Sequence, residues 1–145
     1  MHRAITTVAL LVLTLTAVAA QSNPISERRS LMKSNGDQAK IGAAMIKGQT
    51  PFDQAKAHAV FANFIDVAGK MPNLFPDNSK AGGDTAAAPK IWQDMPAFKA
   101  RFEKLATDSK EAQAATKDLD SFKAAFAKVG KDCADCHESY RIKKD

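Results

Sequence analysis

Apolar residues along this chain recur at intervals of three and four positions, and no stretch shows the strict alternation typical of a half-buried β-strand. This spacing predicts four amphipathic helices, over residues 26–46, 51–70, 94–115 and 118–140. Short connections join them, except for a long one between the second and the third. We therefore expect an all-α fold, an antiparallel four-helix bundle with one long crossover loop between helices two and three.

Residues that favour helix starts and turns support these bounds. Thr50 suits the N-cap of the second helix, with Pro51 at its first position and Asp53 where a capping-box acid belongs. The crossover contains residues that exclude a continuous helix, namely Pro72, Pro76, Gly82, Gly83 and Pro89. A loop of this length inside a compact domain needs something that orders it.

The first twenty residues are typical of a secretory signal peptide. A basic start at Arg3 precedes an uncharged apolar run over residues 4–18, which ends in small residues. The run is short for a membrane-spanning helix. We expect cleavage after Ala19 or Ala20, leaving one domain over residues 21–145.

The only two cysteines and one of three histidines stand together near the C-terminus, as Cys133-Ala-Asp-Cys136-His137. Cys-x-x-Cys-His is the attachment signature of a c-type haem. The thiols add to the haem vinyl groups and the imidazole becomes an axial ligand of the iron. At helical spacing the three side chains project from nearly one face and continue the apolar stripe of the last predicted helix. We therefore expect the haem inside the bundle.

Three other interpretations of the motif fit less well. A redox dithiol of the thioredoxin kind would open a helix within a strand–helix–strand pattern, which the sequence lacks. A zinc site would need a fourth ligand from a second cluster. A disulfide across two residues would be strained and would leave His137 unexplained. Because c-type haem is attached outside the cytoplasm, the motif and the signal peptide together indicate a periplasmic protein.

The formal net charge of +5 bears on the partners that we expect. An exported protein meets little nucleic acid, so we expect none as a partner; a basic surface favours acidic redox partner proteins. Lysines surround the predicted haem-bearing helix, at Lys123, Lys128, Lys131, Lys143 and Lys144. They predict a docking face for an acidic partner, and the alternative is a solvated surface.

With its haem motif near the C-terminus, the chain resembles the class II cytochromes c, the cytochrome c′ family. The resemblance includes an early Arg28-x-x-x-Met32-Lys33 and a mid-chain Gly-Gly-Asp followed by Pro-Lys-Ile-Trp92. A class I cytochrome c has the opposite order, with the haem motif near the N-terminus. Cytochromes c′ are themselves four-helix bundles, so this resemblance and the expected fold are not independent.

The resemblance implies one covalently attached haem c, with Cys133 and Cys136 as its thioether links and His137 as the proximal iron ligand. It places Arg141 near the haem propionates, and Arg28 matches the corresponding position of the first helix. A solvated surface arginine is the alternative for Arg28. Members of the family often dimerise through their first two helices, which makes a homodimer one expected state.

The resemblance also bears on the sixth position of the iron. The segment Leu31-Met32-Lys33-Ser34-Asn35-Gly36 is similar to the low-spin branch, in which methionine is the sixth ligand. Met45, Met71 and Met95 are competing methionines, and a core filler is the alternative role for Met32. We expect His58 at the surface or the edge of the bundle, and Phe75 and Trp92 near the crossover and the haem edge.

These features predict a periplasmic carrier of single electrons, with His137 and Met32 as axial ligands. A thioether ligand raises the reduction potential of haem iron. The alternative is a five-coordinate, high-spin cytochrome c′ that binds nitric oxide or another small gas. We do not expect an enzyme, because no distal histidine paired with arginine lies near Met32, as peroxide chemistry would require.

Overall fold

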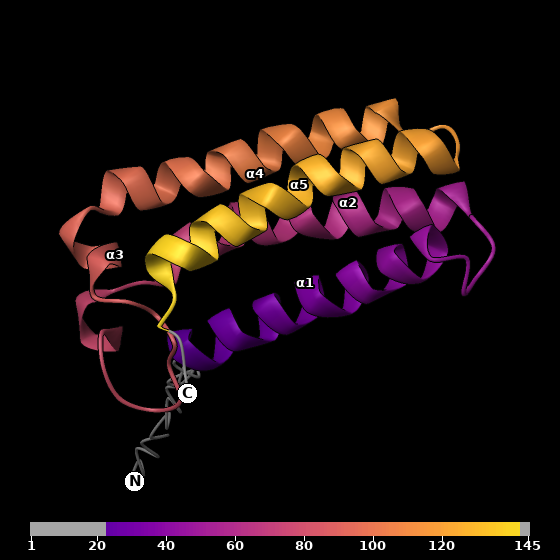
Figure 1. Cartoon of the computed structure of the whole chain (residues 1–145). Helices are drawn as coiled ribbons and strands as arrows, with labels where there is room; N and C mark the ends of the chain where they lie inside the picture. Colours follow the sequence, from indigo (N-terminus) through magenta and orange to yellow (C-terminus); the bar gives the residue numbers. More distant parts are fainter. Residues whose placement is uncertain (1–22, 143–145) are drawn as a thin grey trace, which may run out of the picture.

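The computed structural model describes residues 23–142, which form a bundle of four long helices (Figure 1). These are α1 (Pro24–Ile46), α2 (Gln54–Lys70), α4 (Met95–Ala115) and α5 (Leu119–Tyr140). The crossover between α2 and α4 holds the short helices η1 (Met71–Asn73), η2 (Asp77–Ser79) and α3 (Lys90–Gln93). The expected all-α bundle with one long crossover is confirmed. The predicted signal peptide lies outside the described residues.

The N-cap predicted for the second helix is wrong. α2 begins at Gln54, and the Asp53 side chain caps it by accepting the backbone N–H of Lys56 at 3.0 Å. Thr50 belongs instead to the tight turn that follows α1. In this turn Gly48 has a φ of +67°, and the N–H of Thr50 donates back to the Ala44 carbonyl. This turn keeps Thr50 out of the next helix, so the cap falls three residues later.

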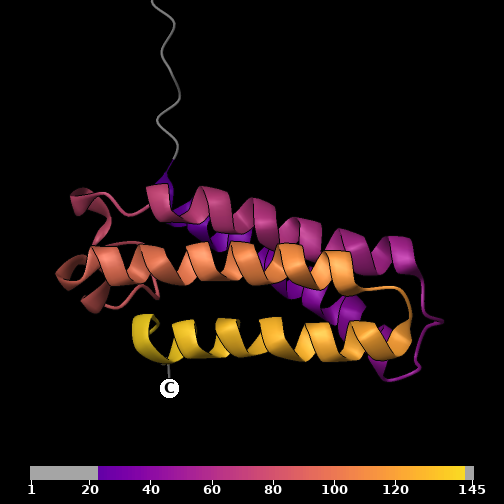
Figure 2. The same cartoon turned by 90° about the horizontal axis from the view of Figure 1, so that it is seen from above.

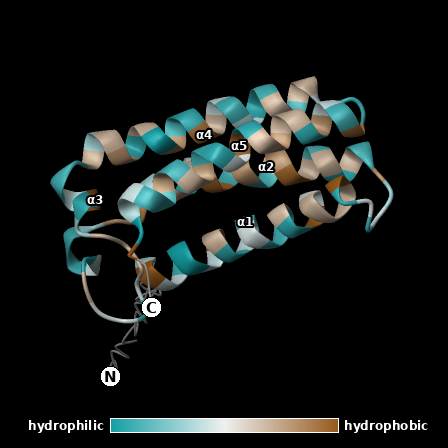
Figure 3. Ribbon diagram, in the orientation of Figure 1, coloured by the Kyte–Doolittle hydropathy of each residue, from teal (hydrophilic) through white to brown (hydrophobic). Residues whose placement is uncertain are grey.

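Aromatic rings from α2, α4 and α5 fill the core. Phe122 is fully buried and lies 5.6 Å from Phe61, ring centre to ring centre. Each long helix combines hydrophobic and hydrophilic positions (Figure 3), as amphipathic helices do. None of the helices within residues 23–142 is long and apolar enough to span a membrane.

Helix α1 crosses the other three long helices obliquely (Figure 2). It comes close to α5 at Gly42, which is buried: a Cβ on this glycine would lie 2.6 Å from Cε2 of Phe126. Only a residue without a side chain allows this approach. Toward its N-terminal end α1 diverges from α5 (Figure 2).

Candidate functional site

A cavity of about 570 Å³ lies between the diverging parts of α1 and α5 and the crossover. Its volume is within the range of small-molecule and cofactor sites. All six predicted site residues line it: Arg28, Met32, Cys133, Cys136, His137 and Arg141. Its apolar wall comes from Phe64, Met71, Ile91, Phe98, Phe102 and Leu105. A large flat apolar group with a reactive edge suits this lining.

The haem-attachment motif lies on the last two turns of α5. Both thiols are free and half-buried, and burial raises the pKa of Cys133 and raises that of Cys136 to about 11. His137 faces the cavity; removal of water by the surrounding protein, and then the nearby Arg141 charge, lower its pKa. At neutral pH the thiols are therefore protonated and the imidazole is neutral, with a nitrogen lone pair available for a metal.

The competing interpretations of the motif find no support in this geometry. Within residues 23–142, no group of three histidine, cysteine or acidic side chains converges as a metal site would require. The motif lies at the end of a helix in an all-α bundle, and not at the start of a helix that follows a strand. The apolar cavity beside the two thiols fits haem attachment better than either a zinc site or a redox dithiol.

Met32 faces the same cavity from α1, on the wall opposite α5. Of the competing methionines, Met71 also lines the cavity, whereas Met45 and Met95 do not. His58 is far from it: its Nε2 lies 2.9 Å from the Thr116 carbonyl, where α4 ends. Of the four methionines considered, Met32 and Met71 thus line the cavity, and only Met32 is on the long helix facing α5.

Arg28 is buried, with 5% of its surface exposed, so the expected alternative of a solvated arginine is wrong. Its Nη1 donates to the Leu74 carbonyl and to Ser79 Oγ, both at 2.9 Å. Its Nη2 donates to the Ser79 carbonyl and to Thr85 Oγ1, both at 3.2 Å. The guanidinium also lies 4.5 Å from the centre of the Phe75 ring. Arg28 is therefore the residue that orders the crossover, a role that sequence reasoning missed.

The crossover is further fixed by Phe75 and Trp92, which pack there as expected. The Trp92 indole donates to the Phe75 carbonyl at 3.0 Å, and their rings pack edge to face. The residues around Arg141 pair with the same loop: the Ala88 N–H donates to the Tyr140 carbonyl, and the Ile142 N–H to the Ala86 carbonyl. The exposed Arg141 thereby stays at the cavity rim.

Sequence reasoning also missed four charged residues of the lining, Arg29, Asp84, Arg101 and Asp132. Arg29 at the rim forms an ion pair of 2.9 Å with Asp84. Arg101 of α4 follows Phe98 by three residues and precedes Leu105 by four, so the apolar stripe of that helix could have indicated it. Asp132 precedes the first cysteine, and its buried Oδ2 has no hydrogen-bond partner.

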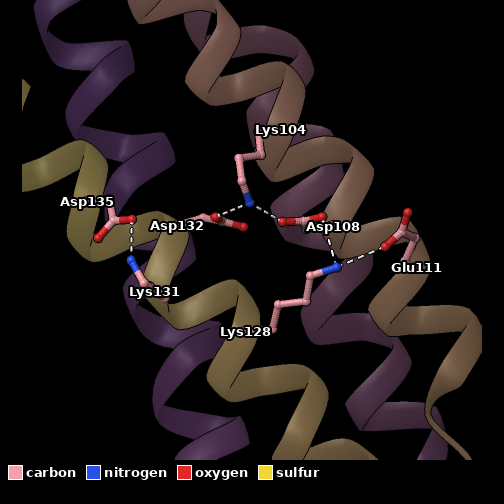
Figure 4. A network of polar contacts seen from close by, with 7 residues as sticks. All are labelled: Lys104, Asp108, Glu111, Lys128, Lys131, Asp132 and Asp135. Atoms are coloured by element: carbon pink, nitrogen blue, oxygen red, sulfur yellow. Dashed lines mark hydrogen bonds and ion pairs between the residues drawn. The ribbon is translucent and has the colours of Figure 1, made fainter.

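Asp132 belongs to a chain of ion pairs between α4 and α5 (Figure 4). Lys104 Nζ bridges Asp108 and Asp132, and Lys128 Nζ bridges Asp108 at 3.1 Å and Glu111 at 2.9 Å. Burial raises the pKa of Asp132, whereas the Lys104 ammonium lowers that of Asp108 to about 2.

The lysines expected to dock an acidic partner pair with acids of the same chain. Lys128 does so in this network, Lys131 pairs with Asp135 at 2.7 Å, and Lys123 lies 3.5 Å from Asp120. Lys143 and Lys144 lie outside the described residues. The positive field on this side of α5 is therefore weaker than the count of lysines indicates.

Comparison with known proteins agrees with this site. Residues 23–141 match the family described as Cytochrome C′. A cytochrome c′ of Rhodopseudomonas palustris is 42% identical over 125 residues, covering 86% of each chain. A cytochrome c-556 of the same organism is 35% identical over 148 residues, covering 99% of each.

The fold agrees as well. A solved structure of cytochrome c′ from Rhodopseudomonas palustris superposes with a TM-score of 0.83 at 43% identity, covering 86% of this chain and 100% of that one. Proteins of this family bind covalently attached haem c, which the cavity beside Cys133 and Cys136 fits in size and polarity. The chain belongs to the cytochrome c′ family, and its cofactor is haem c.

Proposed function

We propose that this chain is a periplasmic electron carrier whose haem has His137 and Met32 as axial ligands. The observation that carries the proposal is that both side chains line one apolar cavity, from α5 and from α1. When bound, the haem iron supplies one-electron exchange between its ferrous and ferric states. Ligation on both sides favours a carrier because no position is left for a substrate.

Different residues of the chain would hold different parts of the haem. Cys133 and Cys136 would hold the cofactor covalently, and the neutral His137 would offer its nitrogen from the same helix. Arg141 at the rim would face the propionates, and Arg28, whose Nη groups bind the crossover, would hold the loop that lies beside the cofactor. The phenylalanine-rich wall excludes water, which together with a thioether ligand favours a raised reduction potential.

The proposal also covers the compartment and the partners of the protein. Export to the periplasm rests on the N-terminal signal sequence and on the chemistry of haem attachment. The partners would be redox proteins that dock beside the cavity rim, where Arg101 and Arg141 are exposed. We propose no enzymatic activity and no nucleic-acid partner, and a homodimer is one state that sedimentation would detect.

One observation favours the second candidate, a five-coordinate protein that binds a small gas. The relative named cytochrome c′ is 42% identical, against 35% for the one named cytochrome c-556. Overall sequence identity to these relatives thus does not favour the electron carrier. The choice between the two candidate functions rests on whether Met32 binds the iron.

The visible spectrum of the purified haem protein separates the two candidates. We expect low-spin ferric iron with a methionine charge-transfer band, and Met32→Leu should abolish the band and give a high-spin spectrum. Met71→Leu is the matched control, because Met71 also lines the cavity, and it should keep the band. A high-spin wild type whose spectrum shifts with nitric oxide would contradict the carrier. A Met32→Leu variant that stays low-spin would show that another residue is the ligand.

A further inference from the structure

The turn of α1 that carries Met32 is tied to α2 by one amide side chain. Ser34 Oγ donates to Asn63 Oδ1 at 2.6 Å, and Asn63 Nδ2 donates to Asn35 Oδ1 at 2.8 Å. Asn63 is half-buried in the middle of α2. Among the residues that the structure describes, no other side-chain hydrogen bond joins α1 to α2.

This tie lies close to the cavity. Asn35 lines the cavity and follows Met32 by three residues, so the two lie one above the other on the same helix face. On the other side of Met32, one turn earlier, Arg28 fixes α1 to the crossover. The turn with Met32 is therefore held from both sides, by polar contacts that sequence spacing does not reveal.

Such support matters because α1 has left α5 at this level (Figure 2). Methionine has three rotatable bonds and no fixed shape, so the place of its sulfur depends on where the backbone is held. A ligand must be kept within roughly 0.5 Å of its working position by the groups around it. Packing against α5 does not supply that support here.

We propose that Asn63 is a positioning residue, which holds the Met32 turn against α2 and so keeps the thioether in place for the iron. This inference rests on the proposed ligation by Met32. Helix α2 supplies no iron ligand, but through Asn63 it would influence whether Met32 binds the iron or leaves the sixth position open.

The test uses the haem protein and imidazole as a probe that competes with Met32 for the iron. Asn63→Leu removes both hydrogen bonds at similar side-chain volume, and Ser34→Ala removes only one. Asn63→Asp is the conservative variant: it still accepts from Ser34, and it accepts from Asn35 once that amide turns over. Gln113→Leu is the control, because it removes a bond of 2.9 Å to the His58 carbonyl, remote from the cavity.

We expect the imidazole affinity of Asn63→Leu to rise by about thirtyfold and that of Ser34→Ala by about fivefold, the effects of two and one net hydrogen bonds. Asn63→Asp should return most of the wild-type affinity and of the methionine band. Gln113→Leu should lower thermal stability and leave the imidazole affinity within about twofold.

Two results would overturn the inference. One is an Asn63→Leu protein whose imidazole affinity stays within about twofold of the wild type. The other is a Gln113→Leu protein whose affinity rises as much, which would mean that any lost stability weakens the ligand. If Asn63→Leu does not fold, the imidazole affinity of Ser34→Ala is the test, and an affinity within about twofold of the wild type would overturn the inference. A wild type without a methionine band refutes the proposed ligation itself, before any variant is compared.

Discussion

At the Arg28 guanidinium, four hydrogen bonds and a ring contact connect the start of α1 to three places in the crossover. A guanidinium has five donors in a fixed fork and can serve these four acceptors at once, whereas an ammonium has only three donors. The buried Ser79 accepts from it with both its hydroxyl and its carbonyl, while the hydroxyl itself donates to the Pro76 carbonyl at 2.8 Å. One side chain thus shapes the wall of the cavity.

We therefore expect Arg28→Leu to lower the free energy of unfolding by about 3 kcal/mol, because it leaves buried polar groups of the crossover without a partner. Arg28→Lys should recover less than half of the loss. Urea denaturation followed by circular dichroism measures both. Arg29→Leu is the control: its ion pair with Asp84 is exposed, so the loss should stay below about 1 kcal/mol. Equal losses at the two positions would contradict a structural role for Arg28.

Between α4 and α5, charged groups replace part of the apolar contact. Asp108 is buried and neighbours two ammonium groups, Lys104 and Lys128, which stabilise its charged form. Its pKa is about 2 in the folded protein, and an unfolded aspartate has a pKa of about 3.9. The ion pairs therefore stabilise the fold fully above about pH 4, and the protein loses that stability as the pH falls toward 2.

Asp108→Asn tests this contribution. The wild type should lose stability between pH 5 and about pH 2.5, and the variant should lose less over the same interval because it has no carboxylate to protonate. Asp132 is retained in both proteins, and its raised pKa acts in the opposite direction. Urea midpoints at the two pH values give the comparison. An equal drop in the two proteins would show that other groups dominate acid unfolding.

The four long helices could be predicted from the sequence because each is amphipathic, and α4 and α5 begin one residue after their predicted starts. Asp94 and Asp118, at those predicted starts, cap the two helices. The start of α2 was missed because a turn anchored on Ala44, not local preference, decides it. The positions of Cys133, Cys136 and His137 on the cavity wall followed from their spacing on one helix. The roles of Asp132 in the lining and of Asn63 beside it did not, since their hydrogen-bond partners lie 28 residues away in the sequence.

In the molecule as a whole, the oblique course of α1 depends on its approach to α5 at Gly42. Phe126 packs against the fully buried Phe122, with ring centres 5.4 Å apart, so its ring cannot retreat into the core. The contact closes one end of the space between α1 and α5, and the cavity opens toward the other end. The shape of the cavity thus follows from one residue without a side chain.

Gly42→Ala should destabilise the protein by about 1 to 2 kcal/mol, because overpacking outweighs the better helix propensity of alanine. Gly130→Ala is the matched control: this glycine of α5 has open space around it, so the change should stabilise by up to about 1 kcal/mol. Adding Phe126→Leu to Gly42→Ala should recover much of the loss. Thermal unfolding measures all three variants, and a Gly42→Ala protein as stable as the control would contradict the tight approach.

The two proposed axial ligands stand near opposite ends of the folded chain, Met32 on α1 and His137 on α5. Bonds from both to one covalently held iron would cross-link the chain into a loop of roughly 100 residues. Closing such a loop lowers the conformational entropy of the unfolded chain. In the entropy model used for disulfides, this raises the free energy of unfolding by about 4 to 5 kcal/mol. Under the proposed ligation, the methionine bond would therefore act as a reversible cross-link, whose release on reduction, oxidation or ligand binding changes the stability of the entire bundle.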